Sequence, residues 1–226
     1  VLAHDEMFSL AGADAYVAKV PGIQSVHPEY AWVSQNLGVW SRDDASVDGI
    51  RQIGRFMMMS KSDYFMHKLK KTIYEGKIGL SCPNVVVHIF SGLGGGIGSG
   101  IFLDVCYMVR EVLKDEENAR ISGYFFLPDV NVAHVESQVV KECIMLNGYA
   151  SLQELDYCMN LENNNGSFKQ VYRERKEIEW KLPPVDFCHL ISAVDNSGNV
   201  RKDAYSYAMN ITSEYVLEFL MKEDRY

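Results

Sequence analysis

The most constraining feature of this chain is a glycine-rich segment near its middle. Residues 91–100 read S-G-L-G-G-G-I-G-S-G, with six glycines between positions 92 and 100. Without side chains, backbone N–H groups can approach a bound anion closely. The segment follows the β-branched run of residues 84–90 and precedes a helical pattern over residues 101–113, whose positive end would point at the same anion. The sequence therefore predicts a phosphate-binding loop between a strand and a helix, since a structural turn alone would need only about one or two glycines.

Three common glycine motifs do not fit this segment. A Walker A loop requires Gly-Lys followed by Ser or Thr, and no lysine lies here. The dinucleotide fingerprint G-x-G-x-x-G fails because Ile97 and Ser99 occupy the positions where its last glycine would fall. A nucleophile elbow centred on Ser99 would require glycine at positions 97 and 101, and both are isoleucine. The segment is therefore predicted to be a phosphate cradle of another kind.

The apolar periodicity along the chain alternates between helix and strand. A helical pattern precedes the glycine segment, and buried strand-like runs follow it at residues 121–127 and 187–194. This alternation predicts an α/β fold, a three-layer Rossmann-like parallel sheet with helices on both faces. Ligands on such sheets bind at the carboxyl ends of the strands, where the glycine loop and the turns at residues 128–129 and 195–196 all fall. Helices are expected over residues 49–74, 101–113, 135–160 (with or without a break at Asn147 and Gly148) and 203–222, and residues 168–180 are expected as an exposed hairpin or a short helix.

Composition and charge narrow the classes of function. The chain has a formal net charge of −8 and a pI near 5.3, which argues against nucleic acid or an anionic membrane surface as its main partner. Its five cysteines are odd in number, widely spaced and without a C-x-x-C pair, so they suggest neither a zinc site nor a disulfide framework. No signal peptide opens the sequence, and no apolar run is long enough to span a membrane. We therefore predict a cytoplasmic protein with no nucleic-acid partner and no membrane insertion.

The glycine loop resembles a family signature. Residues 94–100, Gly-Gly-Gly-Ile-Gly-Ser-Gly, are similar to the Gly-Gly-Gly-Thr-Gly-Ser/Thr-Gly segment that lies between a strand and a helix in tubulin and FtsZ. The resemblance extends to the strand that ends at Pro128, to residues 147–155, to the Val-Asp-Asn of residues 194–196, and to residues 203–222, which look like the start of the long central helix. The chain is most similar to bacterial tubulin-like proteins. It is therefore expected to form one nucleotide-binding domain of the tubulin/FtsZ GTPase type over residues 1–226.

This resemblance implies a guanine-nucleotide site that takes GTP or GDP with Mg²⁺. In the family, the glycine loop holds the phosphates, and the ribose and base lie against later loops and the central helix. Tyr205 or Tyr207 would stack on the base and Asn210 would bond its edge, although their spacings of five and three residues bracket the family spacing of four. Alternatively, each tyrosine is simply a packed helix residue. For Arg51 and Arg55, which could contact phosphate, the alternative is an exposed helix arginine. The implied contacts are Gly94, Gly95, Gly96, Ile97, Gly98, Ser99, Gly100, Arg51 and Arg55 for phosphate, Pro128, Asp129, Asp195, Asn196, Tyr205 and Asn210 for ribose and base, and Asp5 for the metal.

The sequence departs from the family pattern in three places. Ile97 replaces a threonine and so lacks a hydroxyl that could bond a phosphate. Ser-Val-Asp at residues 46–48 stands where Gly-Ala-Gly is expected, and its carboxylate would repel a triphosphate at a cost on the order of a kcal/mol unless a metal intervenes. The first glycine loop of the fold and the C-terminal domain are not among these 226 residues, so the chain is expected to be a fragment of a longer one. No residue is predicted to be a catalytic base.

Three functions remain open at this point. The first is a guanine-nucleotide-binding protein and GTPase that self-associates head to tail into filaments, with the neighbouring subunit completing the active site. Such a fragment alone would bind nucleotide but hardly hydrolyse it. The second is a degenerate tubulin-like domain that senses nucleotide or supports interactions without hydrolysis, which Ile97 and residues 46–48 favour. The third is a Rossmann-type NAD(P) enzyme, which the failed G-x-G-x-x-G register disfavours.

Overall fold

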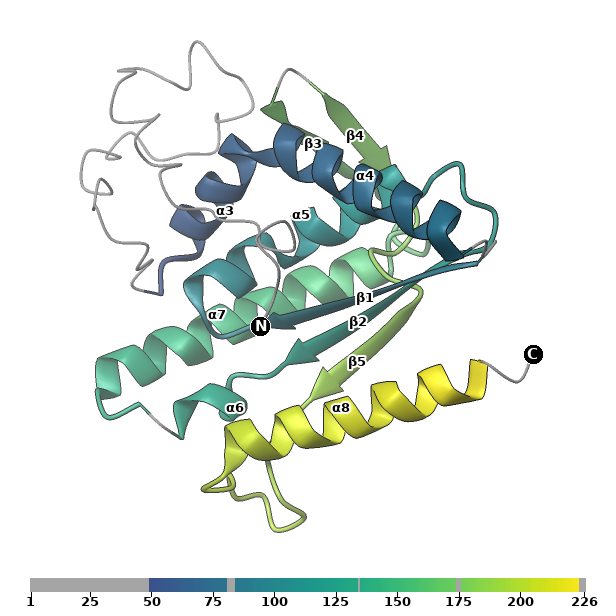
Figure 1. The fold of residues 1–226 in the computed structure, drawn as a ribbon. Helices are drawn as coiled ribbons and strands as arrows, with labels where there is room; N and C mark the ends of the chain where they lie inside the picture. Colours follow the sequence, from purple (N-terminus) through teal and green to yellow (C-terminus); the bar gives the residue numbers. More distant parts are fainter. Residues whose placement is uncertain (1–48, 81–83, 134, 174–175, 224–226) are drawn as a thin grey trace, which may run out of the picture.

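The computed structural model describes residues 49–80, 84–133, 135–173 and 176–223 (Figure 1). The predictions for Asp5 and for residues 46–48 lie outside these described residues.

A parallel three-stranded sheet forms the centre of the described chain. Its strands are β1 (Val85–Gly92), β2 (Ala119–Phe126) and β5 (Phe187–Ile191), in the order β1-β2-β5. β1 pairs with β2 from Val85↔Ala119 to Gly92↔Phe126, and β2 pairs with β5 from Ser122↔Phe187 to Phe126↔Ile191. All three strands therefore end at the same edge of the sheet, as the alternating sequence pattern predicted.

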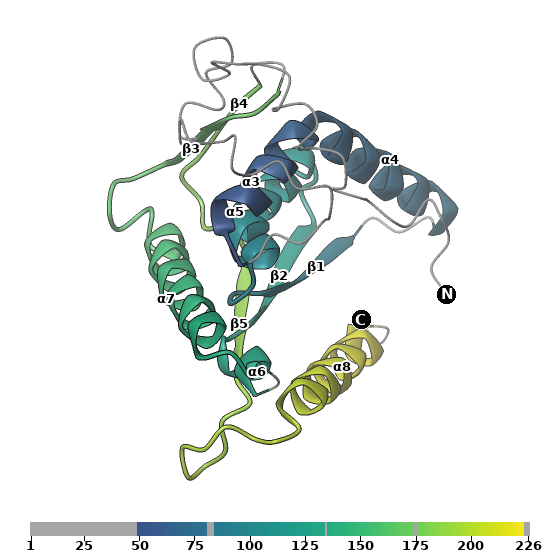
Figure 2. The ribbon, with the colours of Figure 1, turned by 90° about the vertical axis from the view of Figure 1, so that its left-hand side faces the viewer.

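Helices cover both faces of this sheet (Figures 1 and 2). On one face lie α5 (Gly96–Val112) and α7 (Gln138–Met159), with α3 (Arg51–Ser60) and α4 (Ser62–Leu80) packed beside α5. On the other face lies α8 (Ala204–Glu223), while the short α6 (Asp129–Val132) follows β2 at the sheet edge. This arrangement confirms the predicted three-layer α/β fold.

The core lies mainly between the sheet and α5. Phe102, Cys106 and Val109 recur at helical spacing on α5 and are buried against Ile121 and Phe125 of β2. Burying such side chains stabilises the fold by about 1.5–3 kcal/mol each. The apolar period of residues 101–113 thus fixes the face of α5 that meets the sheet.

An antiparallel hairpin links α7 to β5. It consists of β3 (Phe168–Val171) and β4 (Glu177–Trp180), which confirms the hairpin alternative for residues 168–180 and excludes the short helix. Ile178 is buried between two exposed glutamates, which is the alternation of a strand with one solvated face. Together with Tyr172 it packs against Met58 of α3.

Two helix predictions need correction, and a third, which left a break in α7 open, is decided by the structure. The expected helix over residues 49–74 is two helices separated at Lys61, where the Ser60 hydroxyl donates to the Met57 carbonyl and the Ser62 hydroxyl to the Met59 carbonyl. The helix expected from residue 101 already begins at Gly96, because glycines carry no apolar period that would reveal a first turn. α7 continues without a break through Gly148, whose missing side chain admits Pro128.

Candidate functional site

The three loops at the carboxyl edge of the sheet start side by side. The Leu93 N–H donates to the Phe126 carbonyl at 2.9 Å, and the Leu127 N–H donates to the Ile191 carbonyl at 2.8 Å. These bonds extend the parallel pairing past the strand ends. The glycine loop, the loop after β2 and the loop after β5 are thereby brought together, as expected for this fold.

The N-terminus of α5 opens onto this edge without a capping side chain. Gly95 is the N-cap residue, with φ −82° and ψ 157°, and no side-chain hydrogen bond caps the N–H groups of the first turn. The first N–H groups of an α-helix have no acceptor inside the helix, so those of Gly96, Ile97 and Gly98 are free of intrahelical bonds. Gly95 is exposed, and a Cβ added to it would meet no described atom within 4 Å. The end of α5 therefore presents donors and a positive dipole end to a space that no described residue fills.

Most other glycines of the loop are required by packing. A Cβ on Gly96 would lie 2.8 Å from the Gly49 carbonyl carbon, and one on Gly94 would lie 2.6 Å from Cγ2 of Ile144. A Cβ on Gly98 would overlap the Gly92 carbonyl oxygen, and one on Gly100 would overlap the Arg51 carbonyl oxygen. Packing, mainly against α3 and α7, thus explains more of these glycines than the one or two of a simple turn, and Gly95 is the loop glycine at which an added Cβ would meet no described atom within 4 Å.

The two side chains within the loop face inward. Ser99 is 1% exposed and its hydroxyl donates to the Gly95 carbonyl one turn earlier. Ile97 packs with Met57 and Ile53 of α3. The hydroxyl proton of Ser99 is therefore used within the helix, and the isoleucine that replaces the family threonine contributes to the contact between α3 and α5.

The residues expected to hold the ribose and base lie at the same edge, where several also have structural bonds. Pro128 is buried against Gly148. Asp129 Oδ2 accepts from the Ala193 N–H and from the Ser192 hydroxyl at 3.0 Å, which ties α6 to the end of β5. Asp195 Oδ1 accepts from the N–H groups of Ser197 and Asn199, at 2.8 and 3.0 Å, and Asn196 beside it is exposed.

The two residues expected on the central helix do not share a face. Tyr205 and Asn210 are both exposed near the start of α8, but five residues on an α-helix correspond to about 140° around its axis. Tyr207 and Asn210 are only about 60° apart by the same geometry. The Tyr207 ring lies 4.2 Å from the Arg201 guanidinium. Of the two tyrosines, Tyr207 is therefore the one that can face a common ligand with Asn210.

Comparison with known proteins decides the family. A family model described as tubulin-like matches residues 24–224 of the 226. This chain belongs to the tubulin-like family. The match confirms the resemblance drawn from the glycine loop, and a search of curated proteins and a search of solved structures each gave no match.

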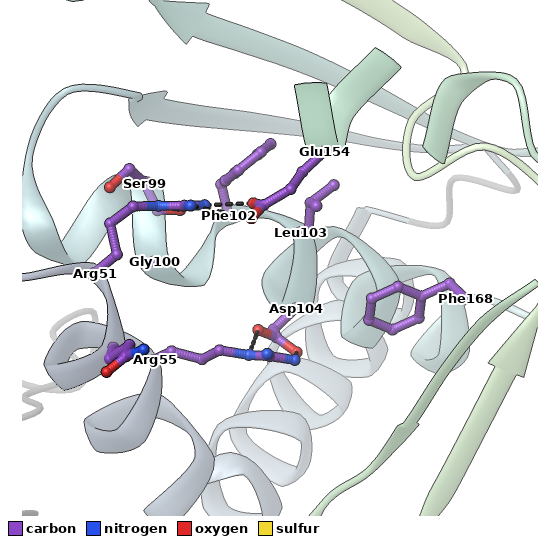
Figure 3. Close-up of a pocket in the computed structure, with 10 residues that line it drawn as sticks. Arg51, Arg55, Ser99, Gly100, Phe102, Leu103, Asp104, Glu154 and Phe168 are labelled. Atoms are coloured by element: carbon purple, nitrogen blue, oxygen red, sulfur yellow. Dashed lines mark hydrogen bonds and ion pairs between the residues drawn. The ribbon is translucent and has the colours of Figure 1, made fainter. Parts of the chain in front are cut away.

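The two arginines predicted to contact phosphate lie along the flank of α5 in this tubulin-like domain (Figure 3). Arg51 donates through Nε and Nη2 to the Ser99 carbonyl, at 3.2 and 2.9 Å, and forms an ion pair with Glu154 of α7. Arg55 donates through Nε to Asp104 Oδ2 at 3.0 Å and through Nη2 to Gln170 at 2.7 Å. Both line a cavity of about 430 Å³ between α3, α5, α7 and β3. Contact of either with phosphate stays a prediction, and it would require these bonds to break.

Asp104 is the centre of a buried polar network that the sequence analysis missed. It is 3% exposed and accepts from Arg55 and from the Tyr172 hydroxyl, the latter at 2.7 Å. Burial by itself lowers the pKa of the Arg55 guanidinium, but the adjacent carboxylate outweighs it and the net pKa is raised. Burial, followed by the Asp104 charge, raises the pKa of Tyr172 well above its ordinary value. The available signal was an acidic residue in the apolar run I-F-L-D-V-C-Y.

Asn147 is a second residue whose position the sequence did not reveal. Its Nδ2 donates to the Gly49 carbonyl at 2.7 Å and to the Gly94 carbonyl at 3.0 Å. One α7 side chain thus bonds both the start of α3 and the glycine loop of the tubulin-like domain. The sequence signal was its place in the segment that resembles the family, which says nothing of these two partners.

Two further properties concern only the described residues. No group of three or more His, Cys, Asp and Glu side chains among them could hold a metal ion. None of the helices in this part of the chain is long and apolar enough to cross a membrane.

Proposed function

We propose that this tubulin-like chain binds a guanine nucleotide, with the phosphates at the N-terminus of α5. The N–H groups of Gly95, Gly96, Ile97 and Gly98 would donate to phosphate oxygens. The observation that carries the proposal is the uncapped, exposed start of a 17-residue helix at the carboxyl edge of a parallel sheet. Gly95 supports it, because packing among the described residues does not require a glycine there and a side chain would occupy the space beside the helix end.

The remainder of the nucleotide would lie across the neighbouring loops. The ribose and base would contact the loops at Pro128 and Asp129 and at Asp195 and Asn196, and reach α8 near Tyr205 or Tyr207 and Asn210. Mg²⁺ in such sites is bound largely by the phosphates and one or two carboxylates. Asp5, proposed as one of these carboxylates, lies outside the described residues.

Self-association and hydrolysis form the second part of the proposal. The subunits would associate head to tail into filaments, and a residue of the neighbouring subunit would complete the site that transfers the γ-phosphoryl group to water. The competing function is nucleotide sensing or interaction without hydrolysis. The packing of Ile97 against α3 supports that alternative, because no hydroxyl is available there. The cysteines of the described residues, Cys106, Cys143, Cys158 and Cys188, are free, which supports a cytoplasmic location for either.

Calorimetric titration tests nucleotide binding directly. The purified chain is titrated with GTP, GDP and ATP in Mg²⁺ and compared with Gly95→Asp and Gly95→Ala. We expect guanine-selective binding, weakened at least tenfold by the aspartate, whose carboxylate would bond the free N–H groups and repel phosphate. The alanine should have a much smaller effect. Absence of binding in the unmodified chain would favour an interaction domain, and equal affinity in all three proteins would exclude the α5 terminus as the phosphate site.

The hydrolysis half of the proposal has its own measurement. Phosphate release from GTP is followed at rising protein concentration with and without Mg²⁺. Catalysis completed by a neighbour predicts a rate per subunit that increases with concentration. Tight binding with no release at any concentration would favour the sensing function.

A further inference from the structure

We propose that Asn147 is the positioning residue that sets the orientation of the glycine loop, an inference that rests on the proposed phosphate site. Its amide has two hydrogens, and Nδ2 donates to two carbonyls from different segments, Gly49 at 2.7 Å and Gly94 at 3.0 Å. Asn147 itself is half-buried on α7. A single side chain therefore fixes the backbone on both sides of the α3–α5 contact.

The bond to Gly94 has a direct consequence for the anion site. A trans peptide group is planar, so the Gly94 carbonyl and the Gly95 N–H point in opposite directions. Holding that carbonyl toward α7 directs the Gly95 N–H away from α7. Asn147 thereby aims the first donor of the cradle without contacting the ligand.

The packing around Asn147 keeps its amide within reach of the loop. Cγ2 of Ile144, one turn earlier on α7, occupies the place that a side chain on Gly94 would need. Gly148 packs against the ring of Pro128, so that α7 lies close to the loop after β2 as well. The segment 144–148 thus joins the glycine loop, the Pro128 loop and the start of α3.

The bond to Gly49 extends this control to α3. Gly49 has φ +76°, a conformation that favours glycine, and it directly precedes Ile50, the N-cap residue of α3. Its carbonyl carbon lies against Gly96, where an added Cβ would come within 2.8 Å. The bond that holds the Gly49 carbonyl therefore also fixes the backbone that packs against Gly96 in the first turn of α5.

The chemistry of the site favours asparagine. An aspartate of the same shape would have no N–H to donate and would place its charge against two carbonyl oxygens. Alanine would leave both carbonyls without this donor. A glutamine keeps the two hydrogens but sets them one methylene further out, so it should restore part of the effect.

The test compares Asn147→Ala, Asn147→Asp and Asn147→Gln with a matched control on the same helix. Asn160→Ala removes an asparagine amide that bonds Asp156 at the C-terminal end of α7, far along the chain from the loop contacts. Two readouts are used: hydrogen–deuterium exchange of peptides covering residues 91–103 without nucleotide, and the Kd for GTP with Mg²⁺.

We expect exchange in residues 91–103 to be about threefold faster or more in Asn147→Ala and Asn147→Asp. GTP affinity should fall roughly tenfold in Asn147→Ala, equivalent to about 1.4 kcal/mol, and further in Asn147→Asp. Asn147→Gln should lie between Asn147→Ala and the unmodified protein, and Asn160→Ala should change neither readout.

The two readouts separate this inference from the proposed function. Unchanged exchange in both Asn147→Ala and Asn147→Gln overturns the positioning role whether or not nucleotide binds. Faster exchange in a protein that binds no nucleotide supports the positioning of the loop and rejects the phosphate site. If Asn147→Ala does not fold, Asn147→Gln provides the test. A Kd for GTP and an exchange rate in Asn147→Gln that equal those of Asn160→Ala would overturn the role.

Discussion

The N-terminal end of α5 and its flank differ in how their polar groups are satisfied. The end has no charged side chain and no cap, and Gly95 there is exposed. The flank has two arginines, and each is bonded to a carboxylate, Arg51 to Glu154 and Arg55 to Asp104 (Figure 3). Both regions were predicted from the sequence to contact phosphate. Only the end offers donors that lack acceptors among the described residues.

Energetics favour the end of the helix over its flank. For Arg55 to reach a phosphate it would have to leave Asp104, a carboxylate that is 3% exposed, and an unpaired buried charge costs several kcal/mol, roughly 3–5. The first N–H groups of α5 have no intrahelical bond to break. An arginine side chain is therefore a weaker sign of an anion site here than an uncapped helix N-terminus.

The largest expected effect separates packing glycines from the open one. Gly100→Val would place its side chain in the backbone of α3, and overpacking of this kind should lower the free energy of unfolding by about 3 kcal/mol or more. Gly95→Val, whose Cβ would meet no described atom within 4 Å, should cost less than about 1 kcal/mol. Urea unfolding of both variants provides the measurement. Equal losses would contradict the difference between the two positions.

A smaller effect is expected at the buried network of the flank. Asp104→Ala removes the acceptor of Arg55 and Tyr172 and should cost about 2–3 kcal/mol, less than a fully buried pair because the Arg55 side chain is 30% exposed. Asp104→Asn, which keeps the shape and one acceptor, should cost less. Both are measured by urea unfolding. A loss below about 0.5 kcal/mol in Asp104→Ala would show that the network is not structural.

The smallest effect is expected at Arg51. Its side chain is 20% exposed and that of Glu154 is 47% exposed, so Arg51→Ala should cost less than about 1 kcal/mol. GTP affinity should change by less than about threefold, which is less than one lost charge-assisted hydrogen bond. Calorimetry on the variant and on Glu154→Ala supplies the comparison. A tenfold loss of affinity in Arg51→Ala alone would restore the phosphate contact that the sequence suggested.

Much of the fold was predictable because its signals are local. The β-branched run before the glycines predicted β1, and the alternation around Ile178 allowed the hairpin that forms. The first turn of α5 was missed because Gly96 and Gly98 carry no apolar period. The division at Lys61 was missed because the apolar period continues across it while serine hydroxyls bond the backbone.

The candidate site was predictable in place but not in detail. Parallel strands put the glycine loop and the loops at Pro128 and Asp195 at one edge, as the structure shows. The partners of individual side chains join residues far apart in the chain. Arg51 meets Glu154 across 103 positions and Arg55 meets Gln170 across 115, separations that no local pattern encodes.

The sequence by itself determined a parallel α/β fold with a glycine loop after its β1 strand, because periodicity and glycine spacing are properties of neighbouring residues. Tertiary structure alone decided that Gly96 and Gly100 make room for α3 while a Cβ added at Gly95 would meet no described atom. It also decided that the arginines pair with carboxylates and that Asn147 bonds the loop. The physical reason is that a glycine, an arginine or an asparagine acquires its role from the atoms that packing brings against it.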